Sequence, residues 1–210
     1  MNLNPAQSDS DEQIVHDLLA GNVQVFSTLV DTMHRPLMRI AEAVLGGSGS
    51  AEEVVQDTWV AVIEGLPKFE KRSTLRTWIS KILVNQAKTR RMKERREVPA
   101  EVGSDDECAA GYEPAGFNVL GMWKESPHCL PGADDTLFSK EAFHLLRQEI
   151  EKLPASQRAV ITLRDLEDWT SEEVCNVLGL SETNQRVLLH RGRQKLREVL
   201  IRRLGTEVAP

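Results

Sequence analysis

The chain has 210 residues, of which 40% are hydrophobic, 28% charged and only 5% aromatic, a composition that favours a soluble helix-rich protein of one or two domains over an all-β or membrane protein. No apolar run approaches the roughly 20 residues of a membrane span, and the N-terminus lacks the pattern of a signal peptide, so we expect a cytoplasmic protein without membrane insertion. The net charge of −6 disfavours nucleic-acid binding only if the charge is spread evenly, because DNA responds to the local field.

The charges are in fact sharply segregated. Residues 1–20 contain four acidic residues and no Lys or Arg, and residues 97–137 contain nine acidic residues and one Lys. Residues 86–96 contain six basic residues and one acidic residue, and residues 181–203 contain seven basic and two acidic ones. Two basic segments, each at the end of a helical region, are therefore separated by an acidic spacer, a pattern that favours nucleic-acid binding at two places.

Two helices are predicted before residue 46. Ser10 and Gln13 form a capping-box pattern that opens a short helix, which Gly21 can end. Apolar residues then recur at steps of three and four over residues 26–44, which predicts a long helix with one buried face and a possible kink at Pro36.

Two more helices follow a glycine-rich break. Ser50 with Glu53 forms a capping pattern for the third helix, which stops near residues 65–67. The loop 68–73 leads to a fourth helix, whose apolar face continues directly into the first basic segment. Trp59 and Trp78, which could stack on unpaired bases, lie on apolar stripes and are predicted to pack in the core instead.

The second half of the chain predicts a helix-turn-helix. An apolar helix ends at Pro154 and another follows, and Thr170 with Glu173 then forms a capping box for a short helix that Gly179 ends. Ser181 immediately caps a long, basic final helix. A short capped helix, a tight turn with Gly and a longer basic helix together are typical of helix-turn-helix DNA-binding motifs.

In such a motif the N-terminal residues of the second helix face base edges, and its basic residues hold phosphates. We therefore assign Arg186 to a guanine and Asn184 or Gln185 to an adenine. The full set of residues predicted to bind duplex DNA is Ser181, Thr183, Asn184, Gln185, Arg186, His190, Arg191 and Arg193. The alternative is a helical hairpin whose charged face is merely solvated.

No enzymatic or cofactor-binding motif is present, and we expect neither catalysis, nor a cofactor, nor a metal site. The cysteines Cys108, Cys129 and Cys175 are widely spaced and are expected to be reduced thiols. His128 beside Cys129 is the nearest approach to a metal or redox site, but one adjacent pair cannot supply three or four ligands.

The chain resembles the extracytoplasmic-function (ECF) sigma factors, the smallest members of the sigma-seventy family, in two long stretches. These are AEEVVQDTWVAVIEGLPKFEKRSTLRTWISKILVNQAKTRRMKERRE (51–97) and LPASQRAVITLRDLEDWTSEEVCNVLGLSETNQRVLLHRGRQKLREVL (153–200), which look like regions two and four of that family. The resemblance implies an all-α protein of two small domains on a long flexible linker. The expected division is an acidic N-terminal segment (1–22), region two (23–97), an acidic linker (98–136), region four (137–204) and a tail (205–210).

The resemblance also implies partners. Region two of the family binds the clamp helices of the largest subunit of RNA polymerase, for which Glu53, Gln56 and Asp57 are the polar candidates here. It also melts the minus-ten promoter element, and the matching strand-binding positions are Lys71, Arg72, Ser73, Thr74, Asn85, Lys88 and Arg91. Region four would read the minus-thirty-five element as duplex and contact the flap of the β subunit, and an anti-sigma factor is the expected regulator.

Several features depart from the family or leave alternatives open. Val187 and Leu188 stand where relatives often have a small or hydroxyl residue and an arginine, and the linker is long. Tyr112, Phe117 and Trp123 in the linker suggest that part of it docks on something. A free-standing helix-turn-helix regulator is the main alternative function, and an anti-sigma-like or RNA-binding interaction protein is a third.

Overall fold

The computed structural model describes residues 5–47, 49–97 and 136–204, and within these residues it contains helices and no strand. The expectation of an all-α protein is confirmed for this part of the chain. The linker with its three aromatic residues, Cys108, His128 and Cys129 lies outside the described residues, as does the tail 205–210.

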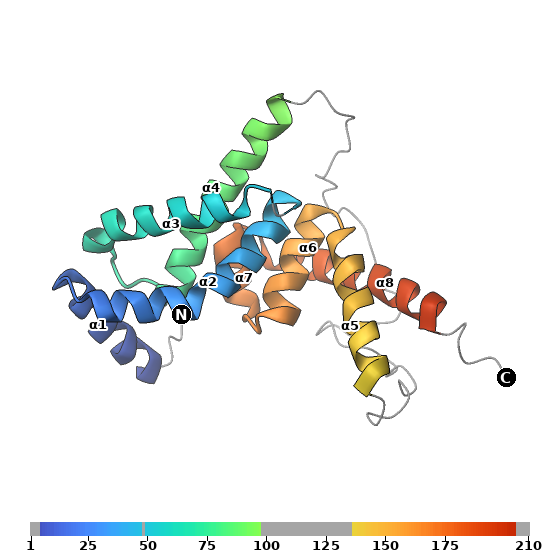
Figure 1. Cartoon of the computed structure of the whole chain (residues 1–210), viewed down its shortest axis with the longest axis horizontal. Helices are drawn as coiled ribbons and strands as arrows, with labels where there is room; N and C mark the ends of the chain where they lie inside the picture. Colours follow the sequence, from blue (N-terminus) through green and yellow to red (C-terminus); the bar gives the residue numbers. More distant parts are fainter. Residues whose placement is uncertain (1–4, 48, 98–135, 205–210) are drawn as a thin grey trace.

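The first bundle consists of α1 (Pro5–Leu19), α2 (Val23–Leu45), α3 (Ala51–Gly65) and α4 (Leu75–Glu97), with a 3₁₀ turn at Leu66–Lys68 (Figure 1). Its core is formed by fully buried side chains from three helices, among them Leu37, Ile40, Val55, Ile79 and Leu83. Trp59 is buried and meets Phe26 edge-on, with ring centroids 5.9 Å apart, as the prediction of core packing required. The half-buried Trp78 packs on Phe69.

Two predicted capping boxes in this bundle are not formed, although α3 does begin directly after Ser50 as predicted. Helix α1 begins at Pro5 and not at Ser10, and Gln13 donates to Asp17 one turn further along the helix, at 3.0 Å. Ser50 stands at the N-cap of α3 but makes no capping hydrogen bond with its side chain. Both patterns satisfied the spacing of a capping box without the backbone geometry that the motif also requires.

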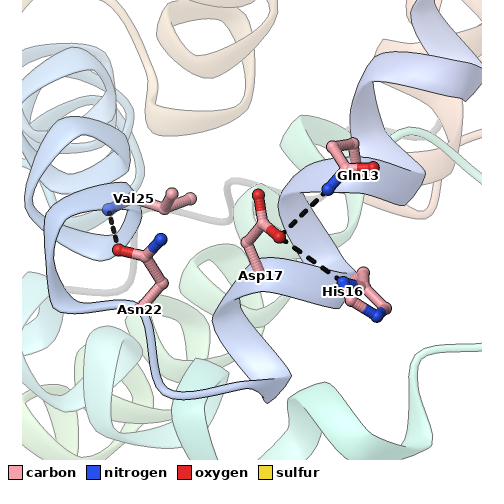
Figure 2. A network of polar contacts seen from close by, with 5 residues as sticks. All are labelled: Gln13, His16, Asp17, Asn22 and Val25. Atoms are coloured by element: carbon pink, nitrogen blue, oxygen red, sulfur yellow. Dashed lines mark hydrogen bonds and ion pairs between the residues drawn. The ribbon is translucent and has the colours of Figure 1, made fainter.

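A cap that sequence reasoning missed stands between α1 and α2. The Asn22 side chain accepts hydrogen bonds from the N–H group of Gln24 and from that of Val25, the latter drawn in Figure 2, so it satisfies two donors at the start of α2. Helix α2 runs through Pro36 without interruption and ends at Gly46, whose φ of 101° favours glycine.

The second bundle consists of α5 (Thr136–Glu151), α6 (Ala155–Ile161), a π-helical turn (Thr162–Leu166), α7 (Ser171–Leu178) and α8 (Glu182–Leu204). The predicted capping box of α7 is confirmed: Glu173 N–H donates to Thr170 Oγ1, and Thr170 N–H donates to Glu173 Oε2. Gly179 ends α7 with φ 70°, and Ser181 Oγ accepts from Asn184 N–H at the start of α8. The helix-turn-helix is therefore present in the predicted place.

The two bundles pack against each other, with α7 lying on α4 and α6 lying on α2 (Figure 1). The buried side chains of both bundles form one continuous apolar core. The C-terminal end of α4 projects beyond the other helices (Figure 1), although α4 still contacts α3 at Arg90, which pairs with Glu53 at 2.7 Å. The sequence did not predict this close contact between the two parts.

Candidate nucleic-acid interface

The start of α8 presents polar side chains to solvent. Ser181, Glu182, Thr183 and Arg186 are exposed, and Asn184 is partly exposed. Arg186 Nη2 lies 3.2 Å from Glu182 Oε2, and since both side chains are more than half exposed this ion pair is weak enough to be exchanged for a stronger contact. The predicted base-reading residues Thr183, Asn184 and Arg186 are therefore accessible from outside.

Two predicted DNA contacts do not fit this arrangement. Gln185 is 1% exposed, and its amide oxygen accepts a hydrogen bond from Ser171 Oγ at 2.9 Å, so it joins α8 to α7 instead of facing a groove. His190 is also buried, and this burial lowers the pKa of its imidazole, with a further contribution from the nearby Arg193. A neutral, buried imidazole is a poor phosphate ligand.

The other predicted phosphate contacts are partly exposed. Arg193 forms a two-pronged ion pair with Asp165, with Nε to Oδ2 at 3.0 Å and Nη2 to Oδ1 at 2.5 Å, which joins α8 to the π-helical turn. Arg191 is partly exposed on the same helix. To bind a phosphate, Arg193 must give up a pair whose two side chains are mostly buried, whereas Arg186 gives up only the exposed pair with Glu182.

In the first bundle, the loop 71–74 and one face of α4 carry the predicted strand-binding residues. Lys71 and Arg72 are exposed, and their ion pairs with Glu12 (3.1 Å) and Glu70 (2.7 Å) are solvent-accessible. Ser73 and Thr74 are partly buried, and Thr74 Oγ1 accepts from Thr77 N–H within the first turn of α4. The loop thus presents two cations beside two hydroxyl groups.

Further along α4, the exposed Asn85 and Lys88 lie on the face that meets α7. Lys88 Nζ donates to the backbone oxygen of Leu178 at 2.6 Å, and the partial burial of this amine lowers its pKa. Lys81, one turn before Asn85, donates to Asn176 Oδ1 at 2.9 Å. Residues 81, 85 and 88 share one exposed helix face, and Lys81 and Lys88 reach from it to α7, so α7 borders the face that was predicted to hold DNA, while Arg91 is partly exposed beyond it. Lys81 was not among the predicted residues, although its spacing from Asn85 places it on the same helix face.

Contacts between the bundles occupy further arginines of the first bundle. Arg39 Nε lies 2.5 Å from Glu167 Oε1, and Arg76 donates to the backbone oxygen of Glu167 at 2.9 Å while its guanidinium lies 4.4 Å from the ring centre of the buried Trp169. From the other side, Arg158 Nε donates to the backbone oxygen of Ala43 at 2.8 Å. An open cavity of about 460 Å³ remains beside these contacts, lined by Arg39, Arg147 and Arg158 among others.

Helix α3 exposes a different surface. The predicted polymerase-binding residues Glu53, Gln56 and Asp57 are exposed, and so are Val60 and Ile63, at 56% and 57%. Glu53 also pairs with Arg90 of α4 at 2.7 Å. The stripe over 53–63 therefore combines acidic, polar and apolar side chains, of which the sequence-based prediction named only Glu53, Gln56 and Asp57.

Features of other site types are absent from the described residues. No group of three or more His, Cys, Asp or Glu side chains that could hold a metal ion is found in 5–47, 49–97 and 136–204. None of the helices in this part of the chain combines the length and apolar composition of a membrane span. Cys175, the one cysteine described, is partly buried, and its burial raises the pKa of the thiol.

Comparison with known proteins matches both halves of the chain to regions of one protein family. The family model described as Sigma-70 region 2 matches residues 29–97, and the model described as Sigma-70, region 4 matches residues 143–196, so together they cover more than half of the chain. The relatives include the ECF RNA polymerase sigma factor SigW of Bacillus subtilis, 24% identical over 182 residues, covering 86% of this chain and 91% of that protein. They also include the ECF RNA polymerase sigma-E factor of Escherichia coli K12, 26% identical over 187 residues, covering 89% and 92%.

Solved structures of sequence-distant proteins share the fold of this chain. The sigma factor RpoE in complex with the anti-sigma factor NepR from Bartonella quintana matches with a TM-score of 0.57 and 22% identity, covering 83% of this chain and 96% of that one. CnrH in complex with the cytosolic domain of CnrY matches with a TM-score of 0.56 and 20% identity, covering 90% and 96%. A free-standing regulator is not favoured, since both sigma regions occur in one chain in the order that the sequence motifs predicted. The chain belongs to the sigma-70 family and is an RNA polymerase sigma factor of the extracytoplasmic-function type.

Proposed function

We propose that this sigma factor divides promoter recognition between two surfaces that it uses only as a subunit of RNA polymerase. The start of α8 reads the minus-thirty-five element as duplex, and the loop 71–74 with the adjoining face of α4 holds the unpaired strand of the minus-ten element. The observation that supports this most directly is the exposure of Thr183 and Arg186 at the N-terminus of a capped recognition helix. In this role the protein selects start sites and performs no catalysis of its own.

On α8, Arg186 is the candidate for a two-pronged contact to a guanine, and Asn184 is the candidate for an adenine. Ser181 and Thr183 lie close enough to the helix N-terminus to hold a phosphate together with backbone N–H groups. Gln185 acts indirectly, because its hydrogen bond with Ser171 sets the angle between α7 and α8. His190 belongs to the packing of the same unit.

On α4, strand capture requires the two bundles to separate. Asn85 and Lys88 lie on the face that borders α7, and Lys88 must give up its bond to Leu178 before it can meet a phosphate. The two promoter elements are also too far apart for one compact body, because about 25 base pairs of duplex at roughly 3.4 Å per pair span more than twice the length of a 23-residue helix. Binding to polymerase is the step that supplies the energy for separation.

The stripe on α3 is the proposed contact with the clamp helices of the largest subunit. Asp57 and Gln56 supply polar contacts, and the exposed Val60 and Ile63 supply apolar area that a partner would bury. The second bundle is proposed to contact the β-subunit flap. Because the structurally similar sigma factor RpoE was solved in complex with the anti-sigma factor NepR, an anti-sigma factor is also the proposed regulator of this chain. The chain itself is proposed to act in the cytoplasm, where polymerase works.

Two substitutions test this division. Asp57→Ala should weaken binding to core polymerase and leave the base preference of the remaining complexes unchanged, whereas Arg186→Ala should leave polymerase binding unchanged and reduce discrimination at one minus-thirty-five base pair by about tenfold, the loss of one two-pronged contact. Polymerase binding is measured by co-purification, and base preference by transcription from a library of promoter variants. Identical effects of the two substitutions would contradict the division.

A further inference from the structure

The N-terminal helix α1 contributes a carboxylate to the first turn of α4. Asp11 Oδ2 accepts a hydrogen bond from Leu75 N–H at 2.7 Å, and Leu75 is the first residue of α4. The first four N–H groups of a helix have no partner within the helix, and a negative charge is favourable at this end of the helix dipole. Asp11 therefore caps α4 from 64 residues away in the chain.

This cap lies directly beside the loop 71–74. Thr74 Oγ1 accepts from Thr77 N–H at 3.2 Å, so Thr74 and Asp11 together satisfy two of the free donors of the first turn. Lys71 has a φ of 55°, which is uncommon for a residue with a side chain, and such a conformation persists only where the surroundings hold it.

The other contact between α1 and the loop is weaker. Glu12 and Lys71 pair at 3.1 Å, but both side chains are half exposed and water screens their attraction. Leu75, by contrast, is 2% exposed, so the hydrogen bond from its N–H is shielded. Of the two contacts, the bond to Asp11 is the one able to fix the start of α4.

We propose that Asp11 is a positioning residue for promoter melting: it holds the first turn of α4, and through it the loop 71–74, in the shape that receives the unpaired strand, without touching DNA itself. The inference rests on the proposed role of the loop in strand capture. A preorganised loop loses less conformational freedom when it binds, so removal of the cap should slow strand capture more than it weakens duplex recognition.

The test compares holoenzymes made with core polymerase and the full chain carrying Asp11→Ala, Asp11→Asn or Asp17→Ala. Asn keeps an acceptor oxygen at the same place. Asp17 is the matched control, since it lies on the same helix but bonds to Gln13 and His16 (Figure 2). Promoters are taken from transcripts that the wild-type holoenzyme initiates, and a fluorescent base analogue in the minus-ten element reports strand opening.

We expect Asp11→Ala to slow strand opening about fivefold, the factor that corresponds to one lost cap, while polymerase binding and affinity for the closed promoter change less than about twofold. Asp11→Asn should recover most of the rate and Asp17→Ala should match the wild type. Hydrogen exchange in Asp11→Ala should accelerate at the Leu75 amide.

Each other outcome has a distinct meaning. Strand opening at the wild-type rate in Asp11→Ala overturns the inference and leaves the proposed function intact. An equal loss of polymerase binding and opening also overturns it, since Asp11 would then stabilise the bundle as a whole. If the wild-type holoenzyme opens no promoter, the proposed function itself fails.

Discussion

Individual side chains of α8 divide by helix face and not by polarity. Residues 185, 189, 192 and 196 recur at steps of three and four and form the face that packs inside the second bundle, where Gln185, Leu189 and Leu196 are buried. Thr183 and Arg186 lie on the opposite, exposed side. A polar residue in the first turn of a recognition helix can therefore serve packing, as Gln185 does through Ser171.

The sequence could have predicted this division only in part. The expectation that Gln185 and His190 contact DNA followed from their chemistry and their position near the helix start. The spacing of Gln185 from Leu189 and Leu196 pointed to burial instead, because it places Gln185 on the same apolar helix face as the two leucines. The burial of His190 was less evident, since Arg191 follows it directly and Arg186 and Arg193 lie one helix turn before and after it.

At the residue scale, His190 should make stability depend on pH. Its folded-state pKa lies below the ordinary value because burial disfavours the imidazolium, so the unfolded chain binds more protons in mildly acidic solution. The free energy of unfolding should therefore be highest above about pH 6.5 and fall as the pH is lowered through the folded-state pKa. Denaturant titrations at a series of pH values should show this fall in the wild type, less of it in His190→Gln, and the wild-type dependence in the exposed-site control His34→Gln. Equal slopes in wild type and His190→Gln would contradict the assignment.

At the scale of elements, local signals were read correctly where all their partners are close in sequence. Thr170 and Glu173 are three residues apart, and their reciprocal hydrogen bonds are present as predicted. The cap of α4 could not be predicted in this way, because Asp11 is brought to Leu75 only by the packing of α1. Ser10 and Ser50 show the opposite failure, in which a capping pattern occurs without the cap.

The contact of α6 with α8 depends on a glycine. A Cβ at position 192 would lie 2.9 Å from Ile161 Cγ1 and 3.2 Å from its Cδ1, which is closer than carbon atoms can approach without displacement. Alanine is otherwise the better residue inside a helix, by about 1 kcal/mol. Gly192→Ala should nevertheless lower the free energy of unfolding, by about 1–3 kcal/mol, because overpacking outweighs helix propensity.

Thermal unfolding followed by circular dichroism measures this effect. Gly47→Ala is the control, since a Cβ there meets nothing within 4 Å. A Gly192→Ala protein that is as stable as the wild type, or more stable, would show that α6 and α8 can move apart at no cost.

At the scale of the whole molecule, the packing of the two bundles joins surfaces that the proposed function requires to separate. Lys81 and Lys88 of α4 bond to α7, and Arg39 and Arg76 bond to Glu167. None of these contacts could be predicted from the sequence. Each region has its own apolar helix faces and its own helix caps, so its local sequence pattern is complete without the other region. The family motifs predict each region but not their mutual arrangement.

Arg39→Ala should make the two bundles separate more readily. Glu167 is 8% exposed, and without Arg39 its buried carboxylate loses its ion-pair partner. Separation of the bundles would let water hydrate this carboxylate, so the separated state becomes more favourable. Small-angle X-ray scattering should give a larger radius of gyration for Arg39→Ala than for wild type, and the exposed-site control Arg35→Ala should match the wild type. An unchanged radius in Arg39→Ala would mean that the apolar contacts alone hold the bundles together.

The central claim is that this acidic chain carries two cationic surfaces that become a promoter reader when polymerase holds them apart. The most direct measurement is to sequence the 5′ ends of transcripts made on genomic DNA by core polymerase with and without the protein. The account predicts a defined set of start sites that appears only with the protein and shares sequence blocks at the minus-ten and minus-thirty-five positions. No new start sites, or new start sites without shared upstream sequence, would contradict it.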